Sequence, residues 1–163
     1  MEIFLIRHGL AGQFGDYEQD SVRPLTEEGV KKTRKVAQRL KTLGIQFDAL
    51  LTSPYARAME TAILLQSIGL ADEIKTVAEL QPEGDRAKIL ALLNDLHSIH
   101  QRVAIVGHEP DLSQLASQLI FGQDCDNLTL KKAGILGLTV PIEGEWVGRC
   151  QLFWLVPPRL MLD

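Results

Sequence analysis

Short apolar segments alternate along this chain with longer segments of helical periodicity, and this alternation limits the folds available to it. The short segments are rich in β-branched and aromatic residues, which is typical of strands buried in a sheet. They cover residues 2–6, 47–52, 74–77 and 102–107. The segments between them place apolar residues three and four positions apart, which predicts helices. These helices cover residues 26–44 (with Thr26 as N-cap), 54–68, 85–99 and 110–121.

The last part of the chain has a different pattern. Residues 134–141 and 145–156 are predicted to be strands, joined by a hairpin-like connection at Glu143-Gly144-Glu145. Four strand–helix units followed by a hairpin predict an α/β fold, a three-layer α/β/α sandwich. Its central sheet is mainly parallel, with an antiparallel edge strand. A chain of 163 residues is the right size for one domain, 1–163.

The composition is that of an ordinary soluble globular protein, with 45% hydrophobic and 23% charged residues. The net charge of −4 argues against a nucleic-acid partner, which requires a basic surface. Two cysteines, Cys125 and Cys150, form neither a disulfide framework nor a zinc pattern. No signal peptide or membrane-length apolar run is present, so we expect a cytoplasmic protein with no membrane partner.

Chemically reactive residues follow the predicted strands at their carboxyl ends. In open α/β sheets, ligands bind beyond these ends, so these residues are expected to meet at one rim of the sheet. Two histidines, two arginines and several carboxylates are among them. The set comprises Arg7, His8 and Gly9 after the first strand, Ser53 and Arg57 after the second, Glu79 and Glu83 after the third, and Gly107, His108 and Glu109 after the fourth.

This set of residues suits a phosphoryl group that is transferred to a histidine. The guanidinium groups match the oxygens of a phosphate and stay charged at any working pH. The imidazoles offer a nucleophile and a second hydrogen-bond donor. Gly9 and Gly107 have no side chains, so the backbone could approach a phosphate closely. Each residue alone has a structural explanation, but their joint placement after separate strands favours a phosphoryl site.

Several segments, taken in series, resemble the histidine phosphatase (phosphoglycerate mutase-like) superfamily. The combination of residues 20–26 and 107–110 is similar to the small SixA-type phosphohistidine phosphatases. The resemblance extends from Met1 to about Phe121, and the remaining residues match only in length and strand pattern. The segments that carry it are Ile6-Arg7-His8-Gly9, Arg23-Pro24-Leu25-Thr26 with Gly29, Thr52-Ser53-Pro54-Tyr55-Ala56-Arg57-Ala58 with Thr61-Ala62, and Val106-Gly107-His108-Glu109-Pro110.

The resemblance implies a hydrolase that passes a phosphoryl group through a phosphohistidine on the enzyme. His8 is the implied nucleophile, and its other ring nitrogen is expected to donate to a carbonyl that fixes the tautomer. Arg7, Arg57 and His108 are implied to bind the phosphoryl oxygens. No metal or organic cofactor is implied, because the cationic side chains stabilise the charge of the transition state.

The general acid is the least determined part of the expected site. Members that cleave phosphate esters protonate the leaving oxygen with a carboxylic acid, and Glu79 is the best positional candidate, followed by Glu83 and Glu109. A phosphohistidine substrate has an imidazole leaving group, which departs more easily and needs less help. SixA-type proteins usually carry an acidic residue after the first glycine, where this chain has Leu10.

We therefore expect a phosphatase that acts on phosphohistidine in a partner protein. One alternative is a phosphatase of small phosphate esters with the same chemistry. Another is a catalytically idle module that binds phosphate or a phosphoprotein. Larger relatives insert segments that cover the pocket between the third and fourth strands, whereas only about two dozen residues separate Val77 from Arg102 here. The short connection predicts an open site, which favours the protein substrate.

Overall fold

The computed structural model describes residues 1–162, and its elements build one six-stranded sheet with helices on both faces. The strands are β1 (Glu2–Arg7), β2 (Ala49–Thr52), β3 (Ile74–Thr76), β4 (Arg102–Gly107), β5 (Ile135–Thr139) and β6 (Gln151–Val156). The helices are α1 (Glu27–Thr42), α2 (Ala56–Ser67), α3 (Arg86–His97) and α4 (Asp111–Phe121), with short 3₁₀ turns η1 (Asp20–Val22), η2 (Ala78–Leu80) and η3 (Pro158–Met161).

The sheet confirms the predicted α/β class. Its strand order is β3-β2-β4-β1-β5-β6, and the first four strands in that order are mutually parallel. β5 runs antiparallel to β1, and β6 runs antiparallel to β5. The antiparallel strand therefore lies just inside the edge formed by β6. The carboxyl ends of the four parallel strands meet at one rim, as the sequence predicted.

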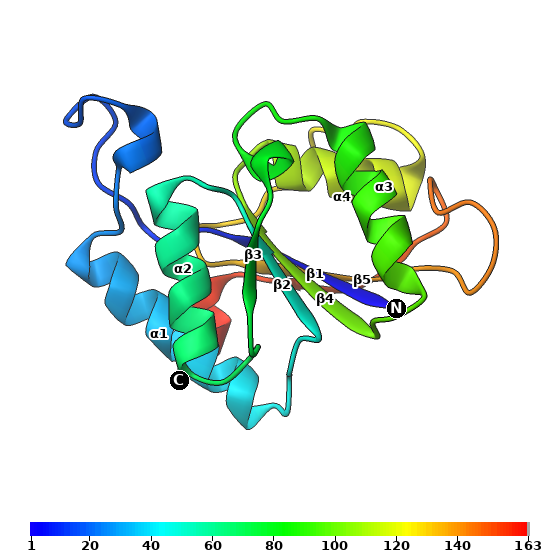
Figure 1. The fold of residues 1–163 in the computed structure, drawn as a ribbon, viewed down its shortest axis with the longest axis horizontal. Coiled ribbons are helices and arrows are strands. Elements are labelled where there is room, and N and C mark those ends of the chain that lie inside the picture. The colour runs from blue at the N-terminus through cyan, green and yellow to red at the C-terminus, as the bar shows by residue number, and fades with distance from the viewer. Residues whose placement is uncertain (163) are drawn as a thin grey trace.

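Residues of β1 alternate between the two helical layers, which explains the three-layer arrangement in Figure 1. Ile3 and Leu5 pack in the core cluster that includes residues of α3 and α4. Phe4 and Ile6 pack in the cluster that includes residues of α1 and α2. Because successive side chains of a strand point to opposite faces, an apolar run such as this one fits a strand buried on both sides.

The helix signals of the sequence are found where they were expected. The Thr26 hydroxyl accepts a hydrogen bond from the Gly29 amide at 3.0 Å and so caps α1. Gly44 follows the end of α1 with a φ of +73°, a conformation that glycine adopts without a steric penalty. Asp85 caps α3 by accepting from the amides of Ala87 and Lys88.

The predicted strand at residues 145–156 begins too early. β6 starts at Gln151, because Gly148 has a φ of +73°, which interrupts the extended backbone of a regular strand. The Gly148 amide donates to the Gln118 carbonyl of α4, and Trp146 is buried. This segment therefore packs as a turn against the helical layer. Among the described residues, no helix is both long and apolar enough to cross a membrane.

Candidate active site

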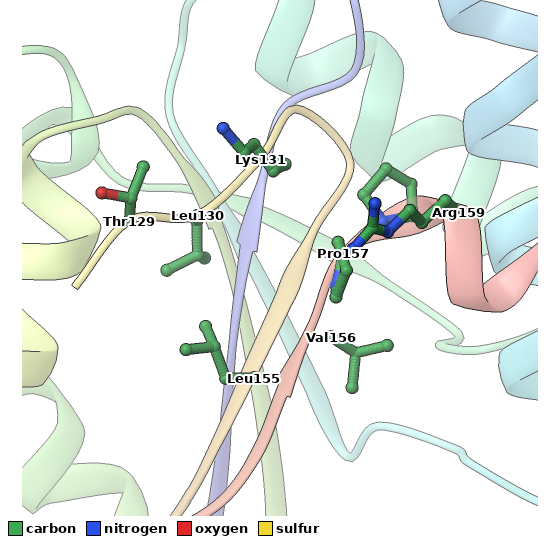
Figure 2. Close-up of a pocket in the computed structure, with 8 residues that line it drawn as sticks. Thr129, Leu130, Lys131, Leu155, Val156, Pro157 and Arg159 are labelled. Atoms are coloured by element: carbon green, nitrogen blue, oxygen red, sulfur yellow. The ribbon is translucent and has the colours of Figure 1, made fainter.

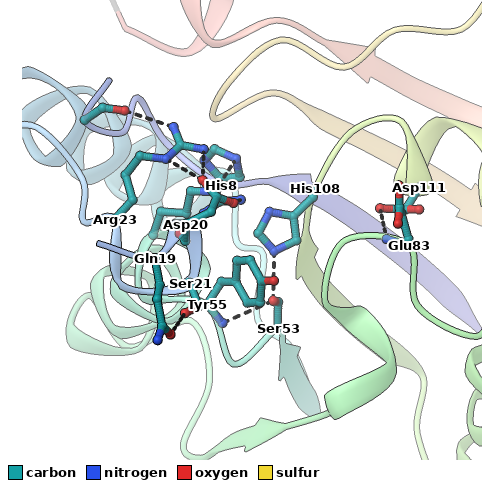
Figure 3. Close-up of polar contacts among 12 residues, drawn as sticks. His8, Gln19, Asp20, Ser21, Arg23, Ser53, Tyr55, Glu83, His108 and Asp111 are labelled. Carbon is teal, nitrogen blue, oxygen red and sulfur yellow. Dashed lines mark hydrogen bonds and ion pairs between the residues drawn. The ribbon is translucent and has the colours of Figure 1, made fainter. Parts of the chain in front are cut away.

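The structure brings together the four residues that the sequence placed at the ends of separate strands. His8 follows β1, Arg57 lies in the first turn of α2, and His108 follows β4 (Figure 3). The Nε of Arg57 is 3.2 Å from the Nε2 of His8, and the two imidazole rings are 5.2 Å apart between centroids. His8, Arg57 and His108 are all at least 95% buried. Arg7 ends β1 beside them.

His8 is held in one tautomer by its two ring contacts. Its Nδ1 lies 2.7 Å from the carbonyl oxygen of Gly9, which can only accept, so Nδ1 carries the proton. Its Nε2 accepts the hydrogen bond from Arg57 and therefore keeps its lone pair. This is the arrangement that the sequence analysis expected, with a carbonyl fixing the tautomer. The lone pair of Nε2 is the one nucleophilic position of the ring.

Both site histidines are neutral at physiological pH. Burial, together with the positive charges of the nearby arginines, lowers the pKa of His8 to about 3. Burial and the charge of Arg57 likewise lower the pKa of His108 to about 3. An imidazole attacks only in its neutral form, so the same burial that excludes water keeps His8 competent as a nucleophile over the whole range above its pKa.

Acidification is expected to destabilise the protein through these two histidines. The unfolded chain takes up protons near pH 6.5, whereas the folded site does not until about pH 3. Stability is therefore lost as the pH falls below 6.5, by about 2 kcal/mol per histidine between pH 7.5 and pH 5. Chemical denaturation at both pH values measures this loss.

The variants His8→Asn and His108→Asn separate the histidine contribution from that of other groups. Each is expected to reduce the loss of unfolding free energy between pH 7.5 and pH 5 by about 2 kcal/mol. If wild type and both variants lose the same free energy over this interval, the two rings are not held neutral in the folded state.

Asp20 forms a bridge between two arginines at the mouth of the site. Its Oδ2 is 2.9 Å from the Nη2 of Arg57, and its backbone carbonyl accepts from Nη1 of the same residue at 2.8 Å. Its Oδ1 is 2.8 Å from both Nε and Nη2 of Arg23. Although partial burial opposes it, the hydrogen bonds from Arg23 and the charge of Arg57 hold the pKa of Asp20 below its ordinary value.

These contacts give Asp20 and Arg23 a place in the site that the sequence analysis did not assign. They form η1 and its C-cap, in an irregular segment that has no periodic pattern. The carboxylate fixes the plane of Arg57, which in turn fixes its Nε beside His8. Asp20 also contributes to the burial of Arg57, whose side chain it contacts through both its carboxylate and its backbone carbonyl.

Arg7 is held by the segment that precedes β5. Its Nη1 donates to the carbonyl of Leu130 at 2.8 Å. The Leu130 amide donates in turn to the carboxylate of Glu109 at 2.5 Å, and the second oxygen of Glu109 accepts from the Ser113 amide at 3.2 Å. Glu109 therefore uses both oxygens for backbone contacts, which argues against its role as general acid and makes it a support for Arg7.

His108 is positioned by Ser53, the residue that follows β2. Ser53 Oγ accepts a hydrogen bond from the Tyr55 amide at 3.2 Å and lies 2.8 Å from the Nε2 of His108 (Figure 3). When the Ser53 hydroxyl donates to Nε2, the ring proton of His108 lies on Nδ1. Within residues 1–162, Nδ1 of His108 and Nε of Arg7 are buried and have no hydrogen-bond partner. Both can therefore donate to an anion in the site.

The other two predicted acid candidates, Glu79 and Glu83, occupy different environments. Glu79 lines a small cavity of about 70 Å³ together with His108, and its side chain is one-third exposed. Glu83 has an exposed side chain and a φ of +62°, and its amide donates to the carboxylate of Asp111. The cavity is also lined by Asp111, which the sequence analysis missed. Burial raises the pKa of Asp111, whose carboxyl group lines the same cavity as His108.

The two glycines of the site are explained by packing as well as by any approach of a phosphate. A Cβ on Gly9 would lie 2.3 Å from the Thr33 hydroxyl of α1, and one on Gly107 would lie 3.2 Å from the Leu112 side chain of α4. Gly9 therefore permits α1 to pack against the end of β1. Its amide also donates to Thr61 of α2 at 3.0 Å.

The charge of the site favours an oxyanion. Asp20 pairs with Arg23 and Arg57, and Glu109 is the carboxylate near Arg7, so three arginines outnumber two carboxylates. Partial burial and the positive charges of the three arginines lower the pKa of nearby Lys132. The described residues hold no group of three or more His, Cys, Asp or Glu side chains that could bind a metal ion. The fold and the site together define an α/β protein that can bind a phosphoryl group between histidines and arginines at its carboxyl rim.

Comparisons with known proteins assign the family. Residues 3–82 match the model of the histidine phosphatase superfamily (branch 1). An uncharacterized protein of Picosynechococcus sp. (strain PCC 7002) is 42% identical over 139 residues, which cover 85% of this chain and 84% of that protein. Phosphohistidine phosphatase SixA of Escherichia coli (strain K12) is 33% identical over 128 residues, 76% of each chain. This chain belongs to the histidine phosphatase superfamily and is of the SixA type.

Structural similarity supports the same assignment. The structure of the protein histidine phosphatase SixA complexed with tungstate has a TM-score of 0.86 and 28% sequence identity, and the match covers 99% of each chain. The fold is therefore phosphoglycerate mutase-like, as the sequence resemblance implied. Members of the superfamily are phosphatases, so the expected class of chemistry agrees with the family.

Proposed function

We propose that this protein hydrolyses phosphohistidine in another protein, through a phosphohistidine formed on its own His8. The observation that carries the proposal is the state of His8. It is buried and neutral, its Nδ1 proton is fixed on the Gly9 carbonyl, and its Nε2 lone pair lies beside Arg57. A neutral nucleophile surrounded by guanidinium groups fits attack on phosphorus.

The first step transfers the phosphoryl group to the enzyme. Nε2 of His8 attacks phosphorus in line, a new N–P bond forms, and the P–N bond to the substrate imidazole breaks. The leaving nitrogen takes a proton from water or from a nearby acid. Arg7, Arg57 and the Nδ1 proton of His108 donate to the three phosphoryl oxygens, whose charge is spread in the transition state.

The second step regenerates the enzyme. Water attacks the phosphorus of phosphorylated His8, the N–P bond breaks, and inorganic phosphate leaves. The lone pair returns to Nε2, where Arg57 again donates to it. We infer that the reaction proceeds without a metal or organic cofactor, because the guanidinium groups supply the positive charge that a metal ion supplies in other phosphoryl-transfer sites.

The family relative in Escherichia coli, phosphohistidine phosphatase SixA, supports phosphohistidine as the substrate. The second candidate is a small phosphate ester. It is favoured by the cavity that Glu79 and Asp111 share with His108, since an ester needs an acid to protonate its leaving oxygen. The catalytically idle module is disfavoured because all four residues implied to bind the phosphoryl group are present, and His8 lies next to both Arg57 and His108.

A direct comparison of substrates tests the proposed function. The wild-type protein is assayed with a histidine-phosphorylated protein, with free phosphohistidine and with a panel of sugar phosphates and phosphoglycerates. We expect kcat/KM for the phosphohistidine protein to exceed that for every ester by at least about 100-fold. This margin is comparable to the rate enhancement that one general acid contributes. Faster cleavage of one ester than of any phosphohistidine substrate would establish the second candidate instead.

Glu79→Gln and Asp111→Asn identify the acid. Loss of the proton donor is expected to lower ester cleavage by about 100-fold, whereas phosphohistidine cleavage changes by less than about threefold, because imidazole is the better leaving group. The variant with the larger effect on the ester marks the donor. Equal losses on both substrates in both variants would indicate a structural role for the two carboxylates.

A further inference from the structure

A groove adjoins the phosphoryl site along the same rim of the sheet. It lies between the segment that precedes β5 and the end of β6, and its volume is about 440 Å³, in the range of known ligand sites. Figure 2 shows Leu130 and Leu155 one above the other on one side of the view and Arg159 on the other side. The residues that line it are Thr129, Leu130, Lys131, Leu155, Val156, Pro157, Pro158 and Arg159.

The groove and the phosphoryl site share a wall. Leu130 lines the groove, and its carbonyl accepts the hydrogen bond from Arg7. Val156, at the end of β6, is paired with Ile135 of β5, which is itself paired with Ile6 of β1, two residues before His8. The end of β6 therefore lies at the rim where His8 lies. A molecule whose phosphoryl group is bound by Arg7 can extend directly into the groove.

The groove combines apolar surface with positive charge. Its floor is apolar, and Leu155 is 45% exposed in it. Lys131 and Arg159 are exposed at its sides, and no carboxylate is among the residues that line it. Lys132 adds a third cation between the groove and the arginines of the site. In a chain with a net charge of −4, this is a local concentration of positive charge beside exposed apolar surface.

We propose that this groove is the docking surface for the phosphorylated protein, which places there an apolar side chain flanked by carboxylates, next to its phosphohistidine. The proposal rests on the proposed function. Charge complementarity with Lys131 and Arg159 and continuity with Arg7 determine the kind of partner. Hydrolysis of the P–N bond itself needs none of the groove side chains, so the groove acts on substrate binding and leaves the chemical step unchanged.

Groove variants assayed on two substrates test the proposal. Leu155→Asp and the double variant Lys131→Glu/Arg159→Glu are compared with wild type on the histidine-phosphorylated protein that wild type cleaves fastest and on free phosphohistidine. We expect KM for the phosphoprotein to rise by about tenfold in each, with kcat unchanged. For free phosphohistidine, kcat/KM of the groove variants is expected to stay within about twofold of the wild-type value.

Matched controls outside the groove are Leu152→Asp on β6 and Lys31→Glu/Lys35→Glu on α1, which are expected to behave as wild type.

Three results would overturn the docking surface. The first is an unchanged KM for the phosphoprotein in both groove variants. The second is a wild-type enzyme that cleaves the phosphoprotein no better than free phosphohistidine. The third is a wild-type dimer that dissociates in the groove variants in sedimentation experiments, which would make a second copy of this chain the occupant. A wild type without activity on every histidine-phosphorylated protein and on free phosphohistidine is a different result, because it contradicts the proposed function itself.

Discussion

Replacement of His8 by asparagine is expected to lower kcat by at least about 10⁴-fold, because it removes the nucleophile from a reaction that has no second path through the site. Asparagine keeps a polar side chain of similar length and has no lone pair that can form a stable bond to phosphorus. Initial rates of phosphate release from free phosphohistidine measure the effect. No other ring in the described site has an unprotonated nitrogen fixed beside Arg57.

His108→Asn is the matched control for this experiment. It also removes a buried imidazole, which is the second histidine at the rim. Its expected loss in kcat is about 10²- to 10³-fold, which is the usual effect of removing one hydrogen-bond donor to the transition state. If the two variants lose activity equally, or if His8→Asn retains more than about 1% of kcat, the assignment of His8 as nucleophile is contradicted.

Replacement of Arg57 by alanine has the second largest expected effect, a fall in kcat/KM of about 10³-fold. Arg57 donates to Nε2 of His8, so its loss removes the contact that orients the nucleophile as well as a cation that stabilises the phosphoryl charge. The more conservative Arg57→Lys is expected to recover less than about one tenth of the activity. An ammonium group is a point charge and cannot hold His8 and Asp20 at once.

The loss of Arg57 also leaves the Asp20 carboxylate with one guanidinium partner instead of two. The double variant Arg57→Ala/Asp20→Asn also removes the carboxylate charge that Arg57 no longer neutralises and serves as the control for folding. It is expected to unfold at a higher denaturant concentration than Arg57→Ala while remaining equally inactive. Recovery of activity together with stability would mean that Arg57 acts only by supporting the fold.

The principal site residues could be predicted from sequence because topology alone brings them together. Arg7, His8 and His108 each end or follow a parallel strand, and Arg57 lies in the first turn of the helix after β2. Four parallel strands in one sheet place these positions at a common rim, whatever the details of side-chain packing. Glu79, which the same argument assigned to this rim, lines the small cavity together with His108.

Other parts of the site depend on contacts that have no local sequence pattern. Asp20 and Arg23 lie in an irregular segment, and only the folded chain shows that they fix Arg57. Asp111 lies in the first turn of α4, where an acidic residue ordinarily serves the helix dipole. The one available signal was its spacing of three residues from His108. Glu109, a predicted acid candidate, is used instead by two backbone amides.

The central claim is that His8 carries the phosphoryl group during turnover, and trapping the intermediate tests it most directly. The wild-type protein is mixed with excess free phosphohistidine, quenched in base within milliseconds to seconds, and digested for mass spectrometry under conditions that preserve P–N bonds. We predict an added phosphoryl group on the peptide that contains His8, on that residue alone, and its absence in His8→Asn. A phosphoryl group on His108, or steady turnover with no phosphorylated enzyme and an active His8→Asn, would contradict the account.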